Sequence, residues 1–127
     1  MGTAAVIRRR LDWADTDAAG YWHHSTFWKY AEAGEAELMR SLGLSGLTFG
    51  ATPRRSVAAE FLRPIYFDAE VEIRFEVDEV GRTSARYRIT LSVDGEAAAT
   101  GTLSVVLVGD DGRPTPWPDE ARRLLAP

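Results

Sequence analysis

The sequence has no cysteine, a single lysine at position 29, two histidines and no long hydrophobic run. Without cysteine the chain can form no disulfide framework, no thiolate nucleophile and no zinc–thiolate site. Any catalytic chemistry must therefore use oxygen or imidazole groups. The longest apolar run, residues 103–108, is interrupted by Ser104 and is far too short to cross a bilayer. We therefore expect no membrane partner.

Basic side chains are also fewer than acidic ones: the chain has 15 Lys and Arg and 19 Asp and Glu residues, so its net charge is −4. This balance argues against nonspecific binding to nucleic acid. The N-terminal residues run into three arginines with no apolar segment behind them, so no secretory signal is predicted and we expect a cytoplasmic protein. A chain of 127 residues is predicted to form one domain, residues 1–127, with a folded surface of roughly 6,700 Å².

One long helix is predicted from Ser25 to about Leu42, because apolar residues recur there every three or four positions. Ser25 is the expected N-cap and Gly43 the expected residue just past the end of the helix. An interior glycine costs about 1 kcal/mol relative to alanine, so Gly34 predicts close packing of the helix on its neighbour. The charged residues fall mostly on another face: Lys29, Glu32, Glu35 and Arg40.

Five strands are predicted around this helix, several of them from strict alternation of apolar and polar residues. Asp94-Gly95 is a strong hairpin signal, which makes the last two strands antiparallel neighbours. The order of one strand, one helix and four strands predicts an α+β fold, with the helix covering one face of a five-stranded antiparallel sheet. The predicted strands are residues 6–13, 56–62, 70–78, 85–93 and 96–108, with a turn at 14–20, a loop at 44–52 and a short terminal helix at 118–125.

Three motifs in this order resemble the hotdog-fold acyl-CoA thioesterases, in particular the 4-hydroxybenzoyl-CoA thioesterase family and its Tol-Pal-associated relatives. The first is Asp15-Thr16-Asp17-Ala18-Ala19-Gly20, followed by an aromatic stretch that ends in His24; the others are residues 60–68 and 79–84. The resemblance spans about residues 6–108. It implies a hotdog fold, in which an antiparallel sheet wraps around one long helix, and hydrolysis of an acyl-CoA or acyl-carrier-protein thioester.

The resemblance also implies roles for individual residues. Asp17 matches the family's catalytic carboxylate, which would attack the thioester carbonyl or act as a general base on water. His24 matches a histidine of the Tol-Pal-associated branch and is expected at the active site. The amides around His24 and Ser25 would stabilise the oxyanion, because the predicted helix begins there. Taken alone, residues 15–20 are more typical of a turn, and Asp15 keeps that interpretation.

Arg82, Thr83 and Ser84 match the turn where family members hold the nucleotide end of coenzyme A, and Arg54 and Arg55 are alternatives with weaker positional support. No cofactor is expected beyond the coenzyme A or phosphopantetheine of the substrate. We also expect no metal, because adjacent histidines seldom bind one ion and there is no third imidazole or cysteine. Four large rings beside the carbonyl site favour an aromatic, polyene or medium-length acyl group: Tyr21, Trp22, Phe27 and Trp28.

Other functions fit the sequence less well. Residues 43–47 fail the nucleophile-elbow pattern of serine esterases at the last position, and the spacing of Asp17 and His24 does not match hotdog hydratases. The alternative from another class is a noncatalytic acyl-thioester-binding hotdog protein that serves as a sensor or scaffold. Exposed sheet edges argue for self-association, and the resemblance implies a homodimer or homotetramer with the acyl site between subunits.

Overall fold

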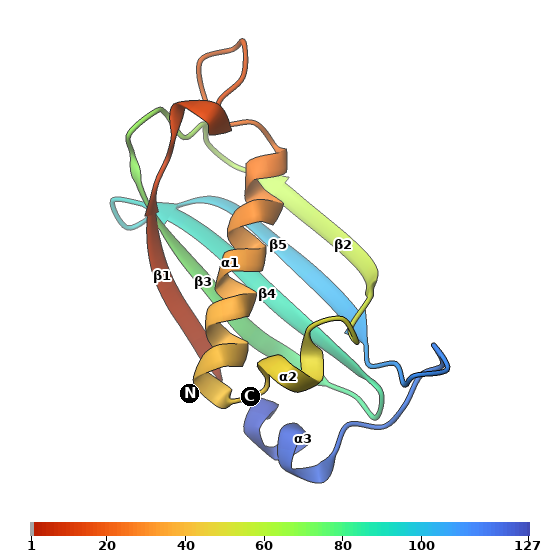
Figure 1. The fold of residues 1–127 in the computed structure, drawn as a ribbon. Helices are drawn as coiled ribbons and strands as arrows, with labels where there is room; N and C mark the ends of the chain where they lie inside the picture. Colours follow the sequence, from red (N-terminus) through yellow and green to blue (C-terminus); the bar gives the residue numbers. More distant parts are fainter. Residues whose placement is uncertain (1) are drawn as a thin grey trace.

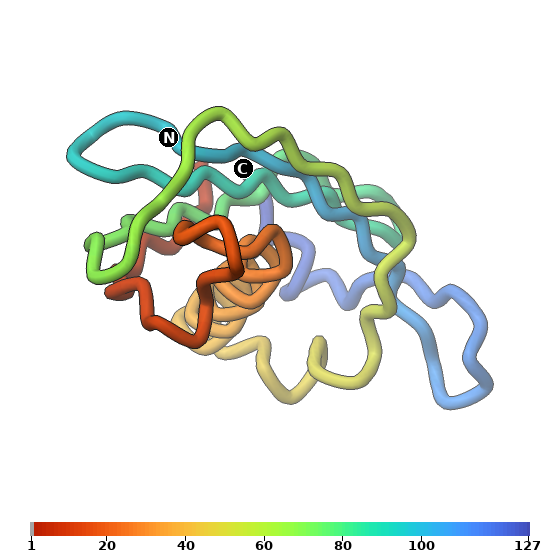
Figure 2. Tube along the Cα trace, turned by 90° about the horizontal axis from the view of Figure 1, so that it is seen from above, coloured from red at the N-terminus to blue at the C-terminus, as the bar shows by residue number. Residues whose placement is uncertain are grey.

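A five-stranded antiparallel sheet curves around one long helix in a computed structural model that describes residues 2–127 (Figures 1 and 2). Met1, where the single predicted domain begins, lies outside the described residues. The sheet order is β1-β3-β4-β5-β2, and every neighbouring pair is antiparallel. This confirms the predicted hotdog fold. The elements are β1 (Ala4–Arg10), α1 (Ser25–Leu42), α2 (Ser45–Thr48), β2 (Arg54–Phe61), β3 (Glu70–Val80), β4 (Ser84–Val93), β5 (Glu96–Val106) and α3 (Asp119–Leu125).

The predicted bounds of α1 are confirmed, but the predicted N-cap is wrong. Ser25 is the first helical residue, and the cap position is occupied by His24, whose side chain makes no capping hydrogen bond. At the other end Gly43 adopts φ +73, and the amide of Leu44 donates to the carbonyl of Met39 at 2.8 Å. A left-handed residue of this kind ends a helix with little strain only when it is glycine.

The first strand begins at Ala4 instead of residue 6 and ends at Arg10 instead of residue 13. The side chain of Leu11 is buried, and its backbone pairs with Ala69 and Asp68, which turns the chain away from the sheet edge. Trp13–Asp15 then forms a 3₁₀ turn. Trp13 was included in the predicted strand because aromatic residues favour strands in general. Its ring is 79% exposed and does not pack on the sheet.

The other corrections are small and concern the ends of elements. Strand β2 begins and ends earlier than predicted, α3 begins one residue later, and the predicted loop at 44–52 contains the single turn of α2. Strand β5 ends at Val106, because Val108 leaves the ladder to form an isolated bridge with Pro114. The hairpin at Asp94-Gly95 is confirmed, with φ +51 and +80 at its two residues.

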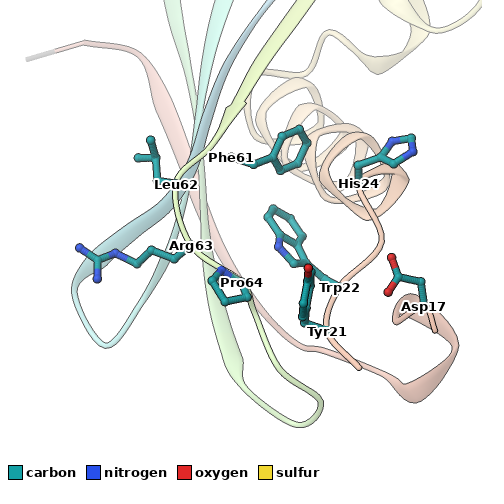
Figure 3. Close-up of a pocket in the computed structure, with 8 residues that line it drawn as sticks. All are labelled: Asp17, Tyr21, Trp22, His24, Phe61, Leu62, Arg63 and Pro64. Carbon is teal, nitrogen blue, oxygen red and sulfur yellow. The ribbon is translucent and has the colours of Figure 1, made fainter. Parts of the chain in front are cut away.

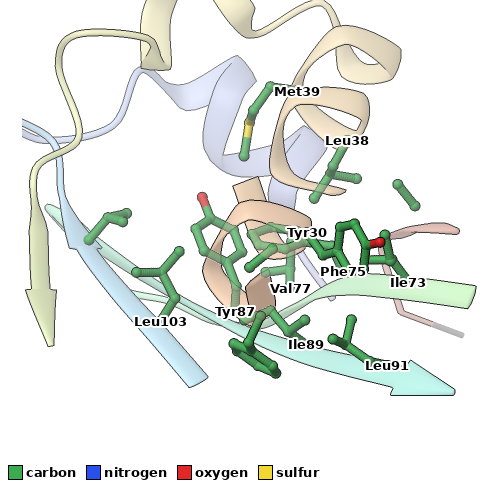
Figure 4. Packing of buried hydrophobic residues seen from close by; sticks show 14 of the residues in the cluster. Tyr30, Leu38, Met39, Ile73, Phe75, Val77, Tyr87, Ile89, Leu91 and Leu103 are labelled. Carbon is green, nitrogen blue, oxygen red and sulfur yellow. The ribbon is translucent and has the colours of Figure 1, made fainter. Parts of the chain in front are cut away.

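The core lies between α1 and the concave face of the sheet (Figure 4). Alternate residues of β3 and β4 are buried as predicted, among them Phe75 and Tyr87, whose rings lie 4.8 Å apart. Glu35 departs from the predicted polar face of α1: its side chain is buried and pairs with Arg54 of β2, with Nη1 2.9 Å from Oε2. This ion pair ties the helix to the last strand of the sheet.

Gly34 marks the closest approach of α1 to the sheet. A Cβ built on this residue would lie 2.8 Å from Cβ of Phe75 and 3.4 Å from Cγ2 of Ile73. The helix thus packs on β3 with no space for a side chain, which confirms the close packing expected there. No helix within residues 2–127 is both long enough and apolar enough to span a membrane.

Replacing Gly34 with alanine should destabilise the protein by about 1–3 kcal/mol, because the new methyl group overlaps Phe75 and outweighs the gain in helix propensity. Urea unfolding measures the change. Gly46→Ala is the matched control, since a Cβ there meets nothing within 4 Å. The packing argument is contradicted if both variants are as stable as the parent.

Candidate functional site

The loop between β1 and α1 is a compact hairpin that presents Asp17 near its tip. Thr16 and Trp22 form an isolated bridge, and the amide of Asp17 donates to the carbonyl of Tyr21 at 3.0 Å. Gly20 closes the turn with φ +87, a conformation that side chains rarely adopt. The turn predicted for residues 14–20 is thereby confirmed in its second half, after the 3₁₀ turn.

The carboxylate of Asp17 is exposed and only partly engaged by the protein. Its Oδ1 accepts a hydrogen bond of 2.8 Å from the amide of Ala19, which is the local turn contact that such a sequence favours. Among the described residues, Oδ2 has no hydrogen-bond partner. One oxygen therefore fixes the side chain, and the other is available to a ligand or to water.

Asp17 and His24 line the same pocket, which has a volume of about 420 Å³. Figure 3 shows both residues on the side formed by the loop and the start of α1, with Leu62 and Arg63 on the opposite side. Arg63 is paired with Glu96 at 2.7 Å, and its Nε donates to the carbonyl of Ala97. The sequence did not single out this wall for ligand contact. The pocket is lined by Asp17, Tyr21, Trp22, His24, Phe61, Leu62, Arg63 and Pro64.

The four rings predicted to line the acyl pocket are divided among three places. Tyr21 and Trp22 line the pocket of Asp17. Phe27 is fully buried beneath it, and Trp28 lines a separate cavity of about 160 Å³ between α1 and β2. Phe61 completes the aromatic wall, with its ring 5.4 Å from that of Trp22. Phe61 is itself about half exposed and lies at the end of an exposed strand, where alternation gave no signal.

Gly101 allows the start of α1 to pack closely on the sheet. A Cβ on Gly101 of β5 would lie 2.5 Å from Cζ of Phe27. The ring of Phe27 thus packs directly on the backbone of β5, and it also contacts Phe61, with centroids 5.9 Å apart. Through these contacts the sheet fixes the height of the helix N-terminus beside the pocket.

The amides at the start of α1 are unequally available. The amide of Ser25 donates to Nδ1 of His23 at 3.1 Å, and that of Thr26 donates to the carbonyl of His23 at 2.9 Å. The amide of His24 has no partner within residues 2–127. Of the two amides predicted for an oxyanion site, only that of His24 is therefore free to bind a ligand. The helix dipole adds positive potential at this position.

Asp15 anchors the loop to the helix. Its backbone carbonyl accepts hydrogen bonds from the amide of His23 at 2.8 Å and from Oγ1 of Thr26 at 3.1 Å. Its carboxylate is buried and lies 2.7 Å from Nζ of Lys29, the only lysine of the chain. Asp15 is thus more than the turn residue that the sequence indicated. The two residues are 14 positions apart, and no local pattern connects them.

Tyr30 lies behind this anchor and is unsuited to act as a base. Burial raises the pKa of its hydroxyl to about 12, and the charges of Asp15 and Asp12 act in the same direction. A phenol with this pKa stays protonated and neutral at physiological pH. Tyr30 therefore contributes packing to the core.

The residues predicted to hold the coenzyme lie at the other end of the sheet. Arg82, Thr83 and Ser84 follow β3, whereas the Asp17 loop lies beside the first residues of β3; eleven residues of strand span roughly 33 Å. Within one chain the structure does not bring them to the Asp17 pocket. Of the alternatives, Arg54 is paired with Glu35 and Glu32.

No cluster of three or more His, Asp or Glu side chains that could hold a metal ion occurs in the part of the chain that is described. The rings of His23 and His24 stack with centroids 4.2 Å apart. Stacked rings of this kind do not converge on one ion, and the expectation of no metal stays a prediction.

Comparisons with known proteins show the family and the fold of the chain. The model of the thioesterase superfamily matches residues 19–99, a range that includes His24 and Arg82 and begins just after Asp17. A protein of Aquifex aeolicus (strain VF5), named as a candidate esterase, is 24% identical over 129 residues, which are 94% of this chain and 96% of that one.

Two solved structures extend the likeness to nearly the whole chain. A thioesterase from Thermus thermophilus, crystallised with coenzyme A and zinc, has a TM-score of 0.88 at 25% identity, over 98% of this chain and 92% of that one. A 1,4-dihydroxy-2-naphthoyl-CoA thioesterase from Synechocystis has a TM-score of 0.85 at 15% identity, over 96% and 95% of the two chains.

Replacing Lys29 with methionine should lower the free energy of unfolding by about 1 kcal/mol, because the buried carboxylate of Asp15 loses its cation while the lysine itself is largely exposed. Urea unfolding gives the value. Arg40→Met is the control on the same helix, since among residues 2–127 Arg40 pairs with Glu37 alone, one turn away at the surface. Equal midpoints for the two variants would contradict the anchoring role of Asp15.

Proposed function

Since the chain belongs to the thioesterase superfamily and its reaction is the hydrolysis of a thioester, we propose that it cleaves an acyl-coenzyme A with Asp17 as the reacting carboxylate. The observation that carries this proposal is that one pocket is lined by Asp17 and by His24, whose amide has no partner among residues 2–127. A thioester carbonyl between them would present its carbon to the carboxylate and its oxygen to the amide.

The helix N-terminus supplies the electrostatic part of the mechanism. As the carbonyl carbon becomes tetrahedral, negative charge develops on the oxygen, and a preoriented N–H together with the helix dipole stabilises that charge. The amide of His24 is suited to this role because no other described group occupies it. The imidazole of His24 would lie beside the reacting sulfur or its leaving thiolate.

Asp17 can act by either of two routes. As a nucleophile, its oxygen attacks the carbonyl carbon, the C–S bond breaks, the thiolate leaves with a proton from water, and water then hydrolyses the mixed anhydride. As a general base, Asp17 takes a proton from a water molecule that attacks the carbonyl directly; the C–S bond then breaks, and the leaving thiolate takes up the proton that Asp17 received. Its free Oδ2 is compatible with both routes.

Coenzyme A is favoured as the thiol by the relatives. The Thermus thermophilus thioesterase was crystallised with coenzyme A, and the Synechocystis enzyme is named for an aromatic coenzyme A thioester. An acyl-carrier protein would offer the same thioester on a phosphopantetheine arm, and an assay with both substrates separates the two.

A noncatalytic acyl-thioester-binding protein would need no carboxylate beside the carbonyl.

A second copy of the chain would supply the part of the site that binds the nucleotide end of coenzyme A. Strand β2 is an edge strand whose apolar side chains are about half exposed: Val57, Phe61 and the adjoining Leu62. The surface of the single chain is 7,321 Å², above the roughly 6,700 Å² expected for its mass. Arg82, Thr83 and Ser84 are too distant to serve the pocket of their own chain. A homodimer or homotetramer would cover the edge and bring these residues to the coenzyme.

Asp17→Asn should lower kcat for acyl-CoA hydrolysis by about a hundredfold or more, because the carboxylate is lost while the amide oxygen can still accept from Ala19. The assay compares several acyl-CoAs with an acyl-carrier protein. Asp111→Asn is a matched control, since Asp111 makes the same kind of turn contact, with the amide of Arg113 at 2.9 Å.

Equal rates for Asp17→Asn and the parent would contradict the mechanism. If both bound acyl-CoA and neither hydrolysed any substrate, the noncatalytic hypothesis would replace it. Preference for the carrier protein would move the substrate assignment to that thiol.

Benzoyl-CoA and hexanoyl-CoA should be hydrolysed with kcat/KM at least about tenfold above acetyl-CoA, since the larger acyl groups bury more apolar surface against Tyr21, Trp22 and Phe61. A Phe61→Ala variant should reduce this preference, and Phe49→Ala, whose ring is exposed outside the pocket, should not. A parent enzyme that prefers acetyl-CoA would contradict the role of the aromatic wall.

A further inference from the structure

His23 caps helix α1 with its imidazole ring. Its Nδ1 lies 3.1 Å from the amide nitrogen of Ser25, which donates to it, and 2.7 Å from Oγ of the same residue. A ring nitrogen that accepts a hydrogen bond from a backbone N–H carries no proton of its own. In this arrangement Nδ1 of His23 is therefore the acceptor of the Ser25 amide.

The ring of His23 takes up one of the amides at the start of α1 that would otherwise have no partner. The amides of Thr26 and Phe27 donate to the carbonyls of His23 and His24, at 2.9 and 3.2 Å. The ring of His23 takes the amide of Ser25. Among the first four amides, the one at His24 is left without a partner in the described chain. The helix thus offers a ligand one donor in a fixed direction.

His23 is itself held from two sides. Its amide donates to the carbonyl of Asp15 at 2.8 Å, and its ring is fixed by Ser25. The ring of His24 stacks on it, with centroids 4.2 Å apart and an interplanar angle of 32°. His23 does not line the pocket, whereas His24 does. Any influence of His23 on a bound thioester must therefore pass through its neighbour.

We propose that His23 is a positioning residue for thioester hydrolysis: its imidazole caps the amide of Ser25 and thereby orients the free amide and the ring of His24 toward the thioester. The sequence assigned no role to this histidine. The proposal rests on the proposed function, because it takes the amide of His24 as the donor to the oxyanion.

A positioning role predicts a particular kinetic effect. Without the cap, the amide of Ser25 competes for the same oxygen and the start of α1 loses one of its fixed contacts. The donor interaction strengthens as charge develops on the oxygen, so its misalignment lowers kcat more than it raises KM. A purely structural role would instead lower the stability and the active fraction, with kcat per active site unchanged.

Two substitutions test the cap. Leucine has a similar bulk and no acceptor, whereas the side-chain oxygen of asparagine can accept from an amide two residues onward. We expect His23→Leu to lower kcat for benzoyl-CoA by roughly tenfold, less than the loss of an oxyanion donor itself would cost, with KM changed less than about twofold. His23→Asn should retain kcat within about threefold. Equal activity of both variants and the parent, or an equal loss in both variants, would overturn the proposal.

Nitrogen-15 NMR of the parent protein tests the cap independently of catalysis. The expected spectrum has the proton of His23 on Nε2 and slow hydrogen exchange at the amide of Ser25, which becomes faster in His23→Leu. A proton on Nδ1, or unchanged exchange in His23→Leu, would overturn the proposal even if the variant folds poorly. If the parent hydrolyses no acyl-CoA but the NMR results are as expected, the proposed function fails and the cap stands.

Discussion

Direct contact between helix α1 and the backbone of the sheet is the constraint on which the site depends. Two glycines make it possible: Gly34 lies against Phe75 of β3, and Gly101 of β5 lies against the ring of Phe27. Side chains at either position would lift the helix from the sheet. Because these contacts fix both the distance and the tilt of α1, they also fix where its N-terminus lies, and with it the amide of His24.

The charges around the helix start divide into a structural set and a reactive set. Asp15 is buried, bonds the helix start through its carbonyl and pairs with Lys29, so it serves to hold the loop. Asp17, two residues later, is exposed, and its Oδ2 has no partner among residues 2–127. Their environments, and not their chemistry, separate the two carboxylates. Because Asp15 holds the loop, Asp17 keeps its position without being buried. Burial would have disfavoured the charged form of its carboxylate.

Local patterns predicted the elements well, and long-range contacts account for what they missed. The bounds of α1 and the Asp94-Gly95 hairpin follow from periodicity and turn chemistry. The end of β1 could not be foreseen, because it depends on the pairing of Leu11 with residues far along the chain. Glu35 was predicted on the polar face because its partner Arg54 lies 19 positions away and no local pattern connects the two residues. The family resemblance pointed to the loop of Asp17, whereas the contact of Asp15 with Lys29 and the cap of α1 by His23 are visible only in the folded chain.

The central claim is that the thioester lies between Asp17 and the amide of His24. A crystal structure of the Asp17→Asn variant with bound benzoyl-CoA tests it most directly. The account predicts a thioester oxygen about 2.7–3.1 Å from the amide nitrogen of His24, the carbonyl carbon facing residue 17, and the nucleotide end near Arg82 of a second copy. A thioester bound away from that amide, for example in the cavity beside Trp28, would contradict it.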